Sequence, residues 1–348
     1  MSQPLHPPSL AGEATRCRPA VEDPVLRTSS WAHGLLDAGL LELPLPGRGA
    51  TPQRYAALAE LGSVDLDLAR LVEAHTDALA IREEQRDPVA QVHGNTWGVW
   101  AAESPRGRVT LTPAGNDRVL LHGTKCWCSG AAHLSHGLLT AWRSDDKRPQ
   151  LVRVAMAQVG VRVNAAQWRA VGMAGSASID VVFDGALAHC VGEPGDYLAR
   201  PGFWHGGAGV AACWYGGALA LARALHQANA RVPTAARCPL RLAAVGKVDV
   251  ALQGTAAVLR GTAQWMDAHP YQDASAVALR VRLAAEACAT RVLDEAGRAL
   301  GAAAFCRDAH FARMAADLPV FVRQSHAERD CAALAQHVLA AEGGNWSL

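Results

Sequence analysis

Residues 121–130 have the sequence LHGTKCWCSG, and this stretch gives the first indication of the fold. Sulfur-bearing and other side chains alternate along residues 126–129 with an aromatic ring among them, which predicts a β-strand. A glycine on each side of the strand allows another group to approach the backbone closely. Trp127 beside Ser129 can stack on a flat ring and hydrogen-bond its polar edge. The same ten residues also fit a hairpin that buries Trp127 in a core.

Composition limits the class of protein. The chain has 348 residues, which is enough for two or three domains. Half of the residues are hydrophobic and 19% are charged, as is typical of a soluble globular protein. A net charge of +1 gives no electrostatic reason to expect nucleic acid or an anionic membrane as a partner. Apolar runs such as residues 207–222 are interrupted by Gly and carry Trp and Tyr, which predicts buried helix rather than a membrane span.

Cysteine usage and the N-terminus bear on localisation. Nine Cys are scattered without a spacing pattern, which indicates reduced thiols that fill cores. Cys126 and Cys128 point to the same face of the predicted strand, but a CxC pair alone does not predict a metal site, and we expect none. The first 19 residues have no apolar segment of the signal-peptide type. We therefore expect a cytoplasmic protein.

The first part of the chain is predicted to be helical. Residues 1–20 are rich in Pro and are expected to be flexible. Residues 21–96 are expected to form a helical domain. Pro52 begins one helix, with Tyr55, Leu58 and Leu61 on one face. Asp65 then caps a second amphipathic helix that runs past His75.

The middle part, residues 97–197, changes to short runs of strand length separated by turn residues. The predicted strands are VTLTP, RVLLHG, CWCSG, GLLTAWR, QLVRVAM, VRVN and IDVVFDG. We expect a small all-β domain, either a barrel or a sandwich.

The last part, residues 198–348, is rich in Ala and Leu with helical periodicity. Pro and Gly residues divide it into long helices over residues 206–229, 239–268, 274–300 and 311–341. Long antiparallel helices of this composition form a bundle. Because they are apolar nearly all round, we expect burial on more than one side and therefore a homo-oligomer.

This layout resembles the acyl-CoA dehydrogenase superfamily of flavoproteins, in which a helical domain, a β-domain and a four-helix bundle follow one another. The resemblance implies an α+β multidomain fold. Four stretches resemble the motifs of this superfamily in the right order: residues 58–75, WAAESP at 100–105, GTKCWCSG at 123–130 and GMAGSASIDVVFD at 172–184.

The resemblance implies FAD bound between the β-domain and the bundle. Trp127 and Ser129 match the Trp and Thr that contact the isoalloxazine ring. A stacking surface and a hydroxyl donor are what such a ring needs. The backbone of Ala102, Glu103 and Ser104 matches the loop that covers the ring.

The adenine half of the cofactor is matched less closely. Gly301 lies where the superfamily has a Gly-Gly turn for the ADP part, and the second Gly is Ala302 here. An Arg that binds the pyrophosphate in the neighbouring subunit is expected at Pro233. Arg231 and Arg237 are near this position, and we take Arg231 as the replacement. This resemblance implies a homodimer or homotetramer.

The catalytic base of the superfamily is missing from both of its known positions. A dehydrogenase of this kind removes a proton next to a thioester carbonyl, and this step needs a carboxylate. The segment that carries this Glu in most members matches residues 323–326, and the Glu is Gln324 here. Branched-chain members place it at a position that matches Val210. Glu328 is one turn further along. We expect a small-molecule substrate, for which an acyl-CoA thioester is the first candidate.

A flavin-dependent monooxygenase branch of the superfamily offers an alternative. Members similar to dibenzothiophene monooxygenases carry Cys-Ser-Gly on the flavin strand and a His in each of two other regions. This chain has Cys128, Ser129 and Gly130 together with His75 and His326. The two His would serve reduced FMN or FAD and oxygen by supplying protons or hydrogen bonds in a dry pocket. A third possibility is a non-catalytic binding protein of the same fold.

Overall fold

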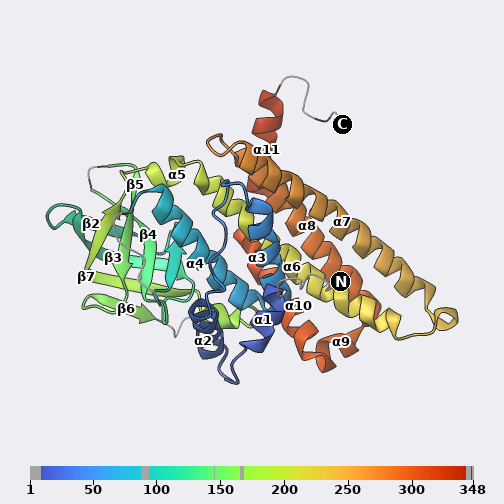
Figure 1. Cartoon of the computed structure of the whole chain (residues 1–348). Coiled ribbons are helices and arrows are strands. Elements are labelled where there is room, and N and C mark those ends of the chain that lie inside the picture. Colours follow the sequence, from blue (N-terminus) through green and yellow to red (C-terminus); the bar gives the residue numbers. More distant parts are fainter. Residues whose placement is uncertain (1–8, 88–93, 145, 165–167, 342–345, 347–348) are drawn as a thin grey trace, which may run out of the picture.

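The expected α+β layout is confirmed. The computed structural model describes residues 9–87, 94–144, 146–164, 168–341 and 346. Helices come first in the chain, then strands, then helices again. In Figure 1 the sheet lies at one end of the molecule and the long helices of the last part lie at the other, with helices of the first part between them.

The first part contains four helices within the described residues: α1 (Leu10–Arg16), α2 (Pro24–Asp37), α3 (Thr51–Val64) and α4 (Leu66–Glu84). Pro lies in the first turn of α3, and Tyr55, Leu58 and Leu61 are buried as predicted. The Asp65 carboxylate accepts the backbone N–H of Leu68 at 3.0 Å and so caps α4. The expectation that residues 1–20 are flexible is wrong for α1, because Ala14 is fully buried there. Residues 1–8 lie outside the described residues.

The middle part forms a small barrel. Among the described residues its strands are β1 (Trp97–Trp100), β2 (Val109–Pro113), β3 (Arg118–Cys128), β4 (His136–Trp142), β5 (Pro149–Ala155), β6 (Val161–Asn164) and β7 (Ile179–Val191). The strands are joined in the order β4-β2-β3-β7-β5, and β5 pairs again with β4, which closes the ring. Two predicted strands are joined in β3, and β1 was not predicted.

The last part begins with α5 (Asp196–Ala199), α6 (Gly202–Ala230), α7 (Pro239–Ala268) and α8 (Ser275–Leu300), and it continues with α9 (Ala302–Arg307), α10 (Ala309–Phe321) and α11 (Glu328–Ala340). The first three long helices were predicted correctly. The single helix predicted over residues 311–341 is wrong, because it is interrupted between Phe321 and Glu328. There Ala327 has a φ of 47°, and the Asp330 carboxylate accepts the backbone N–H of His326 at 3.0 Å.

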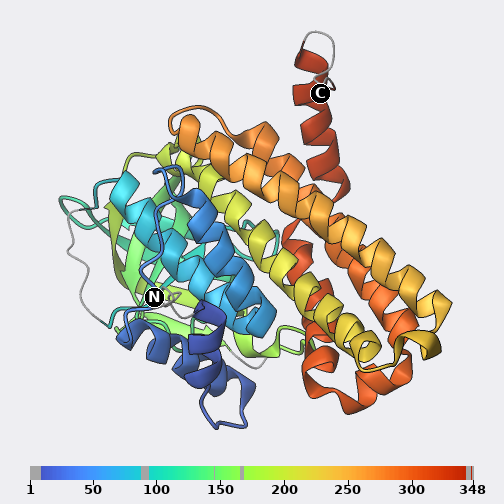
Figure 2. The same ribbon diagram turned by 45° about the vertical axis from the view of Figure 1, so that its right-hand side comes forward.

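Helices α6 and α7 are both long and apolar enough to cross a membrane by length and composition. They differ in their surroundings. In the apolar 18-residue segment of α6, 78% of the residues are buried, whereas the value for the corresponding segment of α7 is 28%. The apolar side chains of α6 therefore form the core, as in a soluble protein. Those of α7 include Leu240, Leu242 and Val250, which are exposed. Figure 2 shows α7 along the outside of the bundle and α11 projecting from it.

We predict that the exposed side of α7 drives self-association. The purified chain should be a dimer or a tetramer by light scattering at micromolar concentration, because exposed apolar helix surface is stabilised by burial. Replacing both Leu242 and Val250 by Glu should shift the protein to a smaller species without loss of helical circular dichroism. Val159→Glu, at an exposed position near the barrel, is the matched control. A wild-type monomer would contradict this prediction.

Candidate functional site

The end of strand β3 presents Trp127 to the outside. The pairing of β3 with β7 shifts register between Lys125 and Cys128, and Trp127 has a φ of 65°. Such a φ is uncommon for a bulky residue, and a bulge redirects the side chain. The indole is 49% exposed while Cys126 and Cys128 are buried. The predicted strand is thus interrupted by a bulge. The Arg106 guanidinium lies 5.7 Å from the centroid of the indole, and this half-exposed ring is of the kind on which a flat ring can stack.

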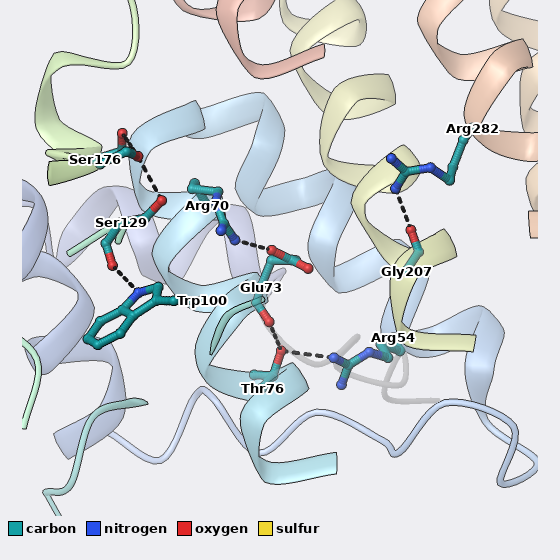
Figure 3. Close-up of polar contacts among 10 residues, drawn as sticks. Arg54, Arg70, Glu73, Thr76, Trp100, Ser129, Ser176, Gly207 and Arg282 are labelled. Carbon is teal, nitrogen blue, oxygen red and sulfur yellow. Dashed lines mark hydrogen bonds and ion pairs between the residues drawn. The ribbon is translucent and has the colours of Figure 1, made fainter. Parts of the chain in front are cut away.

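Ser129 lies directly behind this bulge and is buried. Its Oγ is 2.7 Å from the Oγ of Ser178, which in turn is 3.3 Å from the Oγ of Ser176. The Ser129 carbonyl accepts the indole N–H of Trp100 at 3.1 Å, as Figure 3 shows. The Ser129 hydroxyl is therefore one member of a chain of three hydroxyls. Ser178 was not predicted as a site residue, although it lies in the motif at 172–184.

The loop at 102–104 is fixed against the barrel through Glu103. The ammonium group of buried Lys125 donates to Glu103 Oε1 at 2.9 Å, and Thr140 Oγ1 donates to the same oxygen at 2.6 Å. Burial raises the pKa of this carboxyl, but these hydrogen bonds outweigh burial and hold its pKa below the ordinary value. Ala102 is exposed, and the Ser104 hydroxyl contacts the thiol of Cys126. The loop is thereby placed beside the end of β3.

His75 is buried on the side of α4 that faces β1. Its Nδ1 accepts the backbone N–H of Trp97 at 3.2 Å, so the neutral ring carries its proton on Nε2. Nε2 is buried and has no hydrogen-bond partner among the described residues. Burial, with a smaller effect of His33, lowers the pKa of His75 to about 4. The ring is therefore a neutral N–H donor with a free hydrogen bond at physiological pH.

Gln324 and His326 lie in the break between α10 and α11. The Gln324 side chain is exposed, and its backbone carbonyl accepts a hydrogen bond from Arg282 at 2.8 Å. Arg282 also donates to the carbonyl of Gly207 at 2.7 Å, which ties this segment to α6. The His326 side chain is 59% exposed and lies 3.4 Å from the carboxylate of Asp330. No hydrogen bond or ion pair among the described residues joins it to His75.

Arg231 and Gly301 lie at the other end of the bundle. Arg231 is the residue after α6, and Gly301 separates α8 from α9. Both are exposed. Figure 1 shows these helix ends on the side of the bundle away from the sheet that carries Trp127. A single chain therefore does not bring Arg231 or Gly301 together with Trp127.

A buried polar network on α4 was not predicted. Arg70 donates to Glu73 at 2.6 Å, and the Glu73 carbonyl accepts a hydrogen bond from Thr76 at 3.2 Å. Arg54 of α3 donates to Thr76 at 3.0 Å. In Figure 3 the Arg70–Glu73 pair is drawn between Ser129 and Arg282. Burial raises the pKa of Glu73, although Arg70 opposes this. The polar positions on α4 were the only available signal, and they also fit an exposed helix face.

The chain has the acyl-CoA dehydrogenase fold. No family model and no curated protein matches the sequence, and the likeness is structural. The chain superimposes with a TM-score of 0.77 and 21% identity on TdsC from Paenibacillus sp. A11-2 in complex with FMN and indole, over 94% of this chain and 95% of that one. Another structure of the same protein is described as dibenzothiophene monooxygenase.

Two further solved structures have the same fold. KijD3 in complex with FMN and dTDP-3-amino-2,3,6-trideoxy-4-keto-3-methyl-D-glucose gives a TM-score of 0.78 at 19% identity, over 97% of this chain and 93% of that one. Glutaryl-CoA dehydrogenase from Mycobacterium smegmatis gives 0.80 at 16% identity, over 97% and 94%. The fold is thus shared by proteins of different described activities.

We predict that Trp127→Ala weakens flavin binding. Loss of a stacking surface should cost about 1–3 kcal/mol of binding free energy, which raises the dissociation constant by roughly 5- to 150-fold. Quenching of flavin or protein fluorescence during titration measures this constant. Tyr271→Ala removes an even more exposed aromatic ring from the α7–α8 connection and should leave the affinity unchanged. Equal affinities in wild type and Trp127→Ala would exclude the bulge as the ring site.

We predict that His75 makes the protein less stable in acid. Its pKa is about 4 in the folded chain and 6.5 in the unfolded chain, so the unfolded chain binds more protons between these values. Stability should be full above pH 6.5 and fall as the pH drops toward 4, by about 3 kcal/mol from this group. His75→Asn can still accept the Trp97 N–H but does not titrate. Urea unfolding at pH 7.5 and pH 5 should therefore show a smaller loss in this variant.

Proposed function

We propose that the chain is a flavin-dependent oxidoreductase that binds the isoalloxazine ring beside Trp127. The half-exposed indole on the β-bulge is the observation that carries the proposal, because a bulky residue at positive φ is otherwise unfavourable. Ser178 and Ser129 supply hydroxyls next to it. TdsC and KijD3, which share the fold, were each solved with FMN.

Either FAD or FMN fits this surface, because both carry the same ring. FAD would also need a site for its ADP part, for which Arg231 and Gly301 are the candidates from the sequence. Since both lie at the far end of the bundle, they would come from a second copy of the chain. We therefore propose that the cofactor is FAD if a second copy of the chain completes the site in a homo-oligomer. If one chain forms the whole site, we propose FMN. Titration with each flavin distinguishes the two.

The residues at the base positions favour a reaction without proton abstraction by a carboxylate. Gln324 has no useful proton affinity, and Val210 is apolar and buried. Glu328 is exposed in the first turn of α11, where a carboxylate is stabilised by the helix N-terminus. Desaturation of an acyl thioester is thus the less supported activity of this fold for the chain.

Monooxygenase chemistry is the better supported activity. Bound reduced flavin would supply the two electrons that the reaction with oxygen requires. His75 supports this proposal because its Nε2–H is buried and unpaired among the described residues, so it can donate a hydrogen bond in a place from which water is largely excluded. The description of TdsC as a dibenzothiophene monooxygenase supports the same choice. His326, which is exposed here, would have to move to take part.

We predict that acyl-CoA thioesters reduce bound flavin slowly or not at all. General-base catalysis contributes roughly 10²- to 10⁴-fold, so its loss should lower the rate of reduction by about that factor. The measurement is anaerobic bleaching of the flavin by short- to long-chain acyl-CoA, in wild type and in Gln324→Glu. Bleaching only in Gln324→Glu would show that position 324 can carry the base. Rapid bleaching of the wild type would contradict the prediction and point to Glu328.

The monooxygenase proposal is tested separately with reduced flavin, oxygen and a panel of small aromatic substrates. Mass spectrometry should detect a product that is heavier by one oxygen atom, labelled when ¹⁸O₂ is used. His75→Asn should form much less of it while it binds flavin as the wild type does. If the wild type binds neither FAD nor FMN, the flavin proposal fails, and a non-catalytic binding protein becomes the better supported alternative.

A further inference from the structure

Residues 173–178 form a strained loop that carries Ser176 and Ser178. Met173 has a φ of 58° and Ala177 a φ of 36°, both in the left-handed region that residues with a Cβ rarely adopt. Such a conformation persists only where surrounding contacts impose it. A Cβ on Gly175 would collide with the Thr28 hydroxyl and lie 2.8 Å from Asp67 Oδ2, so the loop is pressed against α2 and α4.

Two buried carboxylates, one on α4 and one on α10, hold this loop. Asp67 of α4 accepts the backbone N–H groups of Gly175 at 3.0 Å and Ser176 at 2.8 Å, one on each oxygen. Asp317 of α10 accepts the backbone N–H of Met173 at 2.6 Å. Each carboxylate is 2% exposed. The second oxygen of Asp317 is buried and has no partner among the described residues.

The loop is connected directly to the proposed flavin surface. The Ser176 carbonyl accepts the backbone N–H of Gly130 at 2.8 Å, and the Ser178 hydroxyl is 2.7 Å from that of Ser129. Both contacts are made next to the bulge at Trp127. Any movement of the loop therefore changes where the serine hydroxyls lie relative to the indole.

We propose that Asp67 and Asp317 are positioning residues that together clamp the 173–178 loop and so fix the serine hydroxyls at the flavin surface. The clamp also makes this surface sensitive to pH. The role at the flavin surface rests on the proposed function, whereas the clamp itself is a property of the protein without flavin.

The sensitivity to pH follows from where the charges lie. Burial, followed by the nearby Asp317 and Asp65, raises the pKa of Asp67 to about 8, and burial raises that of Asp317 to about 6. Arg27 of α2 and Arg313 of α10 are the other charged groups that face the pair. Arg18, in the segment before α2, acts on Arg27, and His310 of α10 lies toward Asp65.

The direction of the pH effect depends on whether the clamped or the released loop binds more protons. In the clamped loop the two acids hold protons up to about pH 6 and 8, whereas in a released, hydrated loop they would lose them near pH 4. The clamped state therefore binds more protons. Raising the pH from about 5 to 9 favours release of the loop and should weaken flavin binding.

Two substitutions at position 317 separate the hydrogen bond from the charge. Asp317→Asn keeps an oxygen for the Met173 N–H and removes the charge. It should bind flavin within about twofold of the wild type at pH 6, and it should lose less affinity than the wild type between pH 6 and 9. Asp317→Ala also removes the acceptor and should bind roughly tenfold more weakly throughout this range. Phe311→Leu, at a buried position on the same helix, should lower the melting temperature without changing the pH profile.

Amide hydrogen exchange of the peptide that covers residues 172–178 tests the clamp without flavin. After correction for intrinsic rates, the wild type should lose protection between pH 6 and 9, Asp317→Asn should lose less, and Asp317→Ala should be unprotected throughout. Protection in Asp317→Ala equal to that of the wild type would overturn the clamp, and parallel profiles for wild type and Asp317→Asn would overturn its sensitivity to pH through Asp317. If the exchange data follow this pattern but no flavin binds, the clamp stands as a structural device and the proposed function fails.

Discussion

Backbone contact between α3 and α6 is the constraint on which the rest of the structure depends. A Cβ on Gly62 of α3 would collide with the Cys213 carbonyl of α6, and one on Gly216 of α6 would collide with the Ala59 carbonyl of α3. Because each helix places a glycine against the backbone of the other, the two approach more closely than side chains would allow. The first helical part is thereby joined to the bundle by backbone contact, which leaves little freedom for sliding.

Helix α4 connects the joined helices α3 and α6 to the candidate flavin site. Its Asp67 holds the 173–178 loop, and its Leu71 packs on Gly130 just after β3. Its His75 accepts the backbone N–H of Trp97 in β1. On its other side Asp77 lies against Gly206 at the start of α6. One helix thus contacts the barrel, the loop and the bundle. The geometry around Trp127 therefore depends on contacts with α4 as well as on the strand that carries it.

The polar groups inside this region set its chemistry. Arg54, Arg70 and His75 each have a buried nitrogen without a hydrogen-bond partner among the described residues, and so does the indole of Trp214 on α6. A buried donor without a partner costs about 1–3 kcal/mol, so such groups are usually satisfied by water or a ligand. Their concentration on α3, α4 and α6 fits a polar interior better than a wholly apolar channel.

The sequence alone determined most of the strands and the three longest helices, since these follow from local chemistry; it did not predict β1 or the break after Phe321. Alternation predicted most strands, helical periodicity predicted α6, α7 and α8, and Asp65 followed by an apolar run predicted the start of α4. The candidate residues Trp127, Ser129 and His75 were also visible, because each is the right residue type in an ordered motif. What the sequence could not give was any property that needs two distant segments to meet.

The tertiary structure decided those properties. The bulge that exposes Trp127 arises where β3 and β7 pair out of register. At the break over residues 322–327, Asp330 accepts a backbone hydrogen bond and Arg282 donates one. Asp67 and Asp317 are 250 residues apart in the chain, yet they hold one loop. Local patterns fix which side chains share a face, whereas burial, pairing register and long-range hydrogen bonds exist only after the chain has closed on itself.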